Sequence, residues 1–180
     1  DNYPEEDSIR VSALCQLGNA LYNSTRYDDA CKAFKRLIKE YPDKEESHRG
    51  RYGLGLSFYA KGDEKEAISI FKDYLSQYPS GPIATGVRFW LGQYYYDKGL
   101  FDNAIDYFEK LINLSVNDEL GDDSCYWLAL SYYRGKKYDA AIEHFRRLKD
   151  SYPGSLFAPQ ALLRISEILI EKRLVDEAQA

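Results

Sequence analysis

The sequence repeats itself every 37 residues. At five places in this period the same residue types return, and most of them are small or apolar. The five columns are Leu17, Leu54, Leu91, Leu128 and Ile165; Gly18, Gly55, Gly92 and Ala129; Tyr22, Tyr59, Tyr96 and Tyr133; Ala30, Ala67, Ala104, Ala141 and Ala178; and Phe34, Phe71, Phe108 and Phe145. Self-similarity at this interval indicates a stack of units, in which each unit buries its apolar face only against its neighbours. Such a stack has no central cleft of the kind that enzymes use, but it presents a long surface suited to holding another protein.

Each period carries the pattern of two helices. In the third period, Val87, Leu91 and Tyr94 recur at steps of three and four residues, as on one face of a helix. Gly99 interrupts the pattern because glycine accepts the positive φ that ends a helix. Asp102 then offers a carboxylate to the unpaired amides at the start of the second helix. The sequence predicts helices over 7–23, 27–40, 45–60, 64–77, 82–97, 102–114, 119–133, 138–151 and 156–171, and a tenth that begins near 175.

These patterns predict an all-α superhelix of antiparallel helix pairs stacked in sequence order. We expect a single domain with repeats over about 8–44, 45–81, 82–118 and 119–155, followed by a partial repeat over 156–180. The glycine and alanine columns let the paired helices approach closely, and the phenylalanine fills the space between that pair and the next. We therefore assign these columns to the core. Because Tyr3-Pro4 resembles the end of a preceding repeat and the sequence lacks methionine, we expect the natural protein to be longer at both ends.

The motif within each period resembles the tetratricopeptide repeat. In the first period it reads Leu14-x2-Leu17-Gly18-x2-Leu21, then Ala30-x3-Phe34 and Pro42. The pattern returns in the next three periods, although Val116 stands where the third should have proline. The resemblance covers essentially the whole chain. It implies a right-handed superhelix, or α-solenoid, whose first helices line a concave, protein-binding face.

The junction between repeats is longer than in the 34-residue family pattern. The extra residues follow Tyr78-Pro79 and Tyr152-Pro153. This lengthened junction is similar to that of bacterial cell-envelope members of the family, such as the lipoprotein of the outer-membrane β-barrel assembly machine and the Tol-associated periplasmic division coordinator. The resemblance implies a location in the bacterial periplasm or cell envelope, with the cytoplasm as the alternative.

Composition and motifs argue against several other functions. The net charge of −5 argues against a nucleic-acid partner. No apolar run approaches the length of a membrane span, so we expect no membrane-spanning segment. The sequence has no metal-binding, nucleophile-elbow or phosphate-loop motif, so we expect no enzyme, metal or cofactor. Cys15, Cys31 and Cys125 are predicted to be buried and not disulfide-bonded within one chain, and His48 and His144 to lie on the surface in water.

Helical spacing places a set of aromatic and polar residues on the concave face that the resemblance implies. Tyrosine, tryptophan and arginine are favoured at protein interfaces. We therefore predict a non-enzymatic module that binds a peptide or helical segment of a partner protein in this groove, as an assembly adaptor. The partner-binding residues are Asn19, Tyr22, Arg49, Tyr52, Tyr59, Phe89, Trp90, Gln93, Tyr96, Tyr126, Trp127, Tyr133 and Arg134. The same spacing places Asn23, Leu56, Asp97, Asp123, Leu130, Arg164 and Glu167 on this face.

Two alternatives stay open at this point. The tyrosine column can pack first helix against first helix, which would give these residues a structural role. The protein can also be a scaffold that forms homo-oligomers through its repeat ends or convex face, without a peptide ligand.

Overall fold

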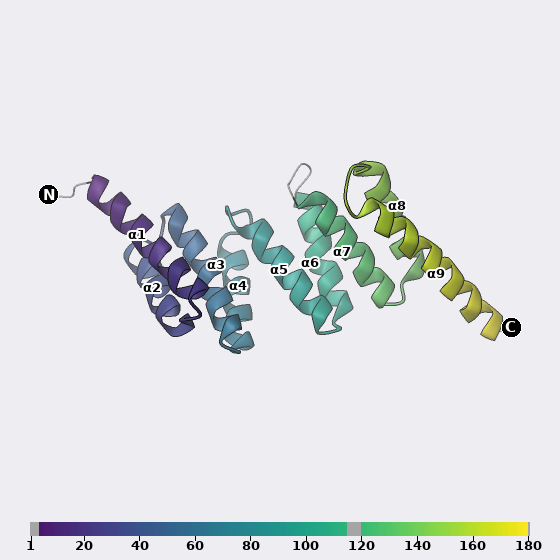
Figure 1. Cartoon of the computed structure of the whole chain (residues 1–180), viewed down its shortest axis with the longest axis horizontal. Helices are drawn as coiled ribbons and strands as arrows, with labels where there is room; N and C mark the ends of the chain where they lie inside the picture. Colours follow the sequence, from purple (N-terminus) through teal and green to yellow (C-terminus); the bar gives the residue numbers. More distant parts are fainter. Residues whose placement is uncertain (1–3, 115–119, 180) are drawn as a thin grey trace. The chain divides into compact units, whose positions relative to one another are not determined.

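The computed structural model describes residues 4–114 and 120–179, with side chains over 6–113 and 120–173, and these residues form helices and turns without any strand (Figure 1). The helices are α1 (Pro4–Asn23), α2 (Tyr27–Glu40), α3 (Glu45–Ala60), α4 (Glu64–Gln77), α5 (Ala84–Asp97), α6 (Phe101–Leu114), α7 (Gly121–Arg134), α8 (Tyr138–Ser151) and α9 (Ala158–Gln179). The predicted all-helical fold is confirmed, and the first eight predicted helices agree with these bounds to within three residues.

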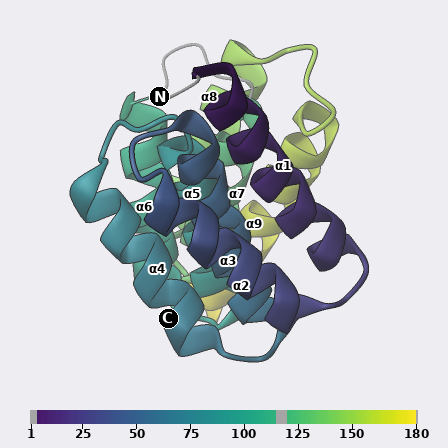
Figure 2. The same cartoon turned by 90° about the vertical axis from the view of Figure 1, so that its left-hand side faces the viewer.

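The chain divides into two compact units, Asp1–Val87 and Arg88–Ala180, with the boundary inside α5. In the first unit, α1 packs on α2, α2 on α3 and α3 on α4. Figure 2 shows α1, α2 and α3 side by side. In the second unit, α6 packs on α7, α7 on α8 and α8 on α9. Helices therefore pack against their neighbours in sequence, as expected for stacked repeats.

In each of the first four repeats, the first helix ends in a turn that has one residue at positive φ. These residues are Gly62 and Gly99, with φ of 87° and 73°, and Thr25 and Lys136, both with φ of 59°. They occupy the same place in successive repeats. Backbone hydrogen bonds close the turn, and in the second repeat the amide of Gly62 donates to the carbonyl oxygen of Tyr59 at 2.9 Å. The left-handed residue reverses the chain within three residues and sets the two helices antiparallel.

The phenylalanine and alanine columns form the centre of the core. Phe34, Phe71, Phe108 and Phe145 are all 0% exposed, as are the alanines four residues before them. The glycine column makes room for the rings, because a Cβ placed on Gly92 would lie 2.7 Å from the Phe108 ring. Burial of each ring contributes about 2–3 kcal/mol.

The last helix differs from the prediction. We expected a helix to end near 171 and a tenth to begin near 175, and this is wrong because α9 continues to Gln179. The segment after Ile170 contains neither glycine nor proline and is rich in good helix formers, so nothing in it stops the helix. Tyr3, Val116 and Ala180, on which other expectations rest, lie outside the described residues.

The two histidines are not solvated surface residues, which corrects a second prediction. His48 is half-buried in α3, with its ring edge-on to those of Tyr74 and Tyr78 at 5.7 and 4.8 Å. His144 is half-buried on α8 and stacks on Tyr132 at 5.0 Å. Neighbouring aromatic rings cover both imidazoles, and this burial lowers the pKa of each.

The three cysteines are buried, as predicted, and their thiols are free in the structure. Burial raises the pKa of Cys15, Cys31 and Cys125. Protonated thiols in such places are poor nucleophiles.

Candidate protein-binding site

Most of the predicted groove residues lie on the first helices of the second unit. Six side chains of α5, α7 and α9 interact with one another there, and we call them the aromatic strip. They are Tyr96, Tyr126, Trp127, Tyr133, Arg164 and Glu167. All six are half-buried.

Trp127 and Tyr96 join α7 to α5. Their rings meet edge to face at 5.1 Å, a geometry that aromatic pairs favour. Tyr96 also packs edge-on against Phe101 at 5.6 Å. Burial raises the pKa of Tyr96, so its hydroxyl stays protonated and can donate a hydrogen bond.

Tyr126 and Arg164 join α7 to α9. The Tyr126 ring stacks on Phe157 at 4.6 Å and meets the core ring of Phe145 at 5.8 Å. Arg164 donates to Glu167 at 2.7 Å, and hydrogen bonds to Glu167 and to Tyr126 raise the pKa of its guanidinium. The strip therefore carries a positive and a negative charge beside its rings.

Tyr133 closes the strip at the far end of α7. Its hydroxyl donates to one carboxylate oxygen of Glu171 at 3.0 Å, and Tyr138 donates to the other at 2.7 Å. Burial and the bond to Glu171 raise the pKa of Tyr133. This bond fixes the polar tip of Tyr133 within the chain.

The other predicted residues of this unit contact further side chains. Phe89 packs edge-on against Phe108 at 5.8 Å. Trp90 stacks on Tyr94 at 5.5 Å, and Gln93 is half-buried. Arg134 is exposed and lies over the Phe101 ring at 5.7 Å.

The first unit supplies the remaining candidates on α1 and α3. Tyr22 and Tyr52 are half-buried and pack against Tyr27 and Phe71, each pair at 5.5 Å. Burial raises the pKa of Tyr52, and the charge interaction with the nearby Tyr22 raises it further. The more exposed members are Asn19, Tyr59 and Arg49, of which Arg49 pairs with Glu45 on its own helix at 2.6 Å.

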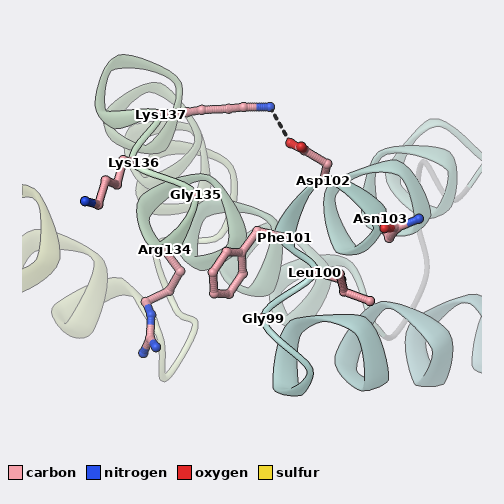
Figure 3. A pocket seen from close by; sticks show the side chains of 9 residues that line it. All are labelled: Gly99, Leu100, Phe101, Asp102, Asn103, Arg134, Gly135, Lys136 and Lys137. Carbon is pink, nitrogen blue, oxygen red and sulfur yellow. Dashed lines mark hydrogen bonds and ion pairs between the residues drawn. The ribbon is translucent and has the colours of Figure 1, made fainter.

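A pocket of about 430 Å³ lies between two neighbouring turns of the second unit (Figure 3). It is lined by residues 99–103 and 134–137. The ammonium group of Lys137 pairs with the carboxylate of Asp102 at 2.7 Å. The ion pair and the Arg134–Phe101 contact tie one repeat to the next. The residues of this pocket therefore hold the repeats in register and do not form a constellation of acid, base and nucleophile.

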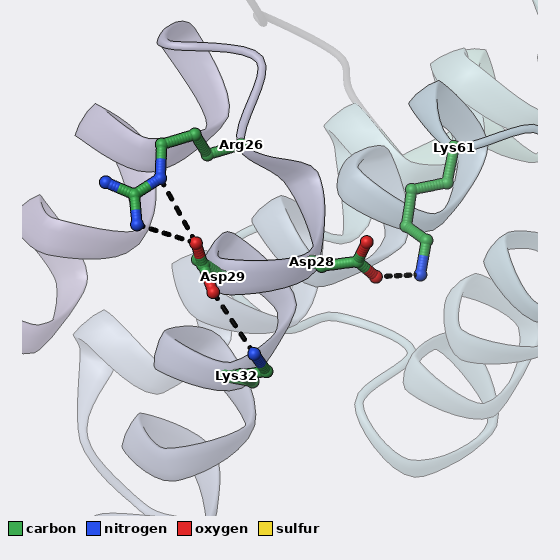
Figure 4. Close-up of polar contacts among 5 residues, drawn as sticks. All are labelled: Arg26, Asp28, Asp29, Lys32 and Lys61. Carbon is green, nitrogen blue, oxygen red and sulfur yellow. Dashed lines mark hydrogen bonds and ion pairs between the residues drawn. The ribbon is translucent and has the colours of Figure 1, made fainter.

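Ion pairs between turns recur along the chain and were not predicted from the sequence. Asp28 at the start of α2 pairs with Lys61 at the end of α3, while Asp29 bonds Arg26 and Lys32 at 2.7 and 3.1 Å (Figure 4). Lys172 of α9 makes the corresponding pair with Asp139 of α8 at 2.6 Å. Repeat-to-repeat spacing of Asp and Lys could have revealed the pattern. These exposed pairs each contribute little to stability.

The described part of the chain contains neither a cluster of metal ligands nor a helix suited to spanning a membrane. No group of three or more metal-ligating side chains gathers among the residues that the structure describes. In the same residues, no helix combines the length and apolar character needed to cross a bilayer.

Comparison with known proteins places the repeats in a family. Three family models, each described as a tetratricopeptide repeat, match residues 15–82, 86–117 and 123–155. A search of curated protein sequences found no match.

Solved structures with the same fold include several bacterial proteins. A tetratricopeptide repeat protein from Parabacteroides merdae has a TM-score of 0.73 at 14% identity, over 90% of this chain and 61% of that one. PilF of Pseudomonas aeruginosa has a TM-score of 0.67 at 17% identity, over 96% and 73%. MamA of Desulfovibrio magneticus has a TM-score of 0.65 at 14% identity, over 91% and 96%.

At these identities, the likeness concerns the fold alone. Tetratricopeptide repeats generally mediate protein–protein interactions and are typically not enzymes. Because the three family models together span most of its length, the chain belongs to the tetratricopeptide repeat family.

Proposed function

We propose that this protein is a non-enzymatic adaptor that binds a peptide or helical segment of a partner protein along the aromatic strip. One observation carries the proposal: the rings of Tyr96, Trp127, Tyr126 and Tyr133 lie with Arg164 and Glu167 on consecutive first helices of one unit.

The chemistry of the strip suits a peptide. Half-buried rings with polar edges lose little conformational freedom when a partner covers them, and they offer both apolar and hydrogen-bonding contact. Arg164 and Glu167 can exchange their mutual ion pair for a backbone carbonyl, an amide or a charged side chain of the partner. The strip is thus built for a partner that presents mixed polar and apolar groups.

A scaffold that self-associates through its repeat ends is the second candidate, and one observation on α1 favours it. Leu17 is 49% exposed, whereas its equivalents Leu54, Leu91 and Leu128 are at most 7% exposed. Ile9 on the same helix is 69% exposed. Sedimentation velocity of the chain and of Leu17→Glu tests this candidate, because a scaffold of this kind would dissociate in the variant.

The test of the adaptor proposal compares binding with stability in the same variants. The immobilised chain captures partners from a lysate of the source organism, and the purified partner is then titrated against Trp127→Ala and Arg164→Ala. We expect Trp127→Ala to weaken binding by about 2–4 kcal/mol. Lys110→Ala serves as the control, because Lys110 is exposed on α6 and pairs with Asp106 on the same helix.

The same measurement can overturn the proposal. If Trp127→Ala lowers the melting temperature but leaves the affinity unchanged, the strip is part of the core, and the scaffold candidate is favoured.

The cellular location is part of the same proposal, and the lengthened repeat junction supports a location in the bacterial cell envelope. Fractionation of the source organism that finds the protein only in the cytoplasm would contradict it.

A further inference from the structure

The pocket of Figure 3 lies where the fourth repeat departs from the pattern of the others. One position of the 37-residue period, which we call the lysine column, is occupied by Lys61, Lys98, Gly135 and Lys172. Lys61 pairs with Asp28 of the preceding repeat, and its ammonium lies over the Phe58 ring at 5.7 Å. A lysine of this column therefore lies across the space between two turns. Gly135 has no side chain to place there.

The backbone does not require glycine at this position. Gly135 has φ of −77° and ψ of 5°, and Lys61 has φ of −75° and ψ of −10° at the equivalent place. Their amides donate equivalent hydrogen bonds, to the carbonyl oxygens of Ser131 and Ser57 at 2.9 and 3.1 Å. A lysine is thus compatible with this turn, and the consequence of glycine is open space beside Phe101.

Lys137 makes the ion pair that the lysine column makes elsewhere. It follows Gly135 by two residues, and its ammonium pairs with Asp102 at 2.7 Å. Asp102 is the equivalent of Asp28 and Asp139, the partners of the column lysines Lys61 and Lys172. The link between repeats is therefore kept, and a pocket of about 430 Å³ lies beside it.

The residues that line this pocket carry an excess of positive charge. Arg134, Lys136 and Lys137 supply three cations and Asp102 supplies one anion, which leaves a net charge of +2. Asp102 is already paired with Lys137, and no carboxylate in the described part of the chain pairs with Arg134 or Lys136. The whole chain has a net charge of −5, so the sign of the charge is reversed at this place.

Apolar surface lies next to these charges. Leu100 is 49% exposed, whereas the equivalent residues in the second and fourth repeats are the charged Asp63 and Lys137. Phe101 is half-buried, and the guanidinium of Arg134 lies 5.7 Å from the centre of its ring. In the view of Figure 3, Phe101 lies between Arg134 and Leu100. The pocket thus combines an unpaired cation with an apolar wall.

We propose that this pocket binds a small organic carboxylate with an apolar body. Arg134 pairs with the carboxylate, since a guanidinium can donate to both of its oxygens. The apolar body lies on Phe101 and Leu100, in the space that a lysine at Gly135 would occupy. The volume falls within the range of small-molecule sites. The proposal does not depend on the adaptor function, because no residue of the aromatic strip lines the pocket.

The test titrates naphthoate into the isotope-labelled 180-residue chain and follows the chemical shifts of the backbone amides. We expect saturable shifts at Gly99 and Gly135, which both line the pocket, with a Kd of about 1 mM or lower. Acetate carries the charge without the apolar body, and naphthalenemethanol carries the apolar body without the charge. Each should bind about tenfold more weakly than naphthoate, or less well still.

Two variants test the residues that the proposal names. Gly135→Lys restores the lysine column in a backbone conformation that Lys61 already adopts, so it should keep the melting temperature and abolish the naphthoate shift at Gly99. Arg134→Gln removes the guanidinium and should weaken naphthoate binding about tenfold. Lys110→Ala is the control, because Lys110 is exposed on α6 and pairs with Asp106 on the same helix. It should bind naphthoate like the parent chain.

Several results would overturn the proposal. Naphthoate shifts that do not saturate, or that are as large elsewhere in the chain as at Gly99, would show that there is no specific site. Equal binding of acetate would mean that the apolar wall plays no part, and equal binding of naphthalenemethanol that the cations play none. Unchanged naphthoate binding by Gly135→Lys or by Arg134→Gln would place the ligand outside this pocket. If Gly135→Lys lowers the melting temperature, Arg134→Gln and the comparison of the three ligands decide.

Discussion

Replacing Gly92 by alanine tests the packing of the small-residue column, and Gly86 on the same helix provides a matched control. Alanine is favoured over glycine in a helix by about 0.8–1.0 kcal/mol. A Cβ on Gly86 would meet nothing within 4 Å, so Gly86→Ala should be stabilising. A Cβ on Gly92 would lie 2.7 Å from the ring of Phe108, which is 0% exposed, so the buried ring would have to shift.

The expected signs of the two changes are opposite. Overpacking of this kind costs about 1–3 kcal/mol, which exceeds the gain in helix propensity. Gly86→Ala should raise the unfolding free energy by about 0.5–1 kcal/mol, and Gly92→Ala should lower it by about 1 kcal/mol. Urea unfolding followed by circular dichroism measures both. Equal stabilisation by the two substitutions would refute the reasoning, and would mean that the Phe108 ring shifts at no cost.

Two further predictions concern titratable groups. Burial holds the pKa of His144 below its usual value, so the unfolded chain takes up a proton at a pH where the native chain resists it. Stability should therefore fall as the pH drops below about 6.5, and His144→Phe, which keeps the stacked ring, should flatten that dependence in urea titrations at several pH values. The thiols of Cys15, Cys31 and Cys125 should react slowly with DTNB in the native chain, and three per chain should react after denaturation without reductant. Fewer than three would mean that a disulfide forms.

Local signals explain why the helices were predictable. The bounds of α1 to α8 follow from residues that act within one turn of the chain, such as Gly62 and Gly99 at positive φ. The same local signals failed at α9, where the repeat register predicted a turn. There, Arg173 occupies the turn position, and a run of helix formers continues the helix.

Burial was harder to predict than helix position, because it depends on neighbours in space. His48 and His144 carry polar rings, yet aromatic side chains of adjacent helices cover them. Leu17 belongs to an apolar column, yet it is 49% exposed because no described helix lies over it. The groove residues stay a prediction, since their rings pack within the chain and their ability to bind a partner has not been measured.

Salt concentration tests the contribution of charge to binding at the aromatic strip. The strip includes the charged pair Arg164–Glu167, whose side chains are 39% and 40% exposed, so ions in solution can screen a partner's charges there. Raising the salt concentration from about 0.05 to 0.5 M should therefore weaken the binding of a charged partner several-fold. Arg164→Ala should lower the affinity at low salt and make it depend less on salt, because the variant lacks one of the two charges. If the parent chain and Arg164→Ala lose affinity equally as the salt concentration rises, the charges of the strip do not contact the partner.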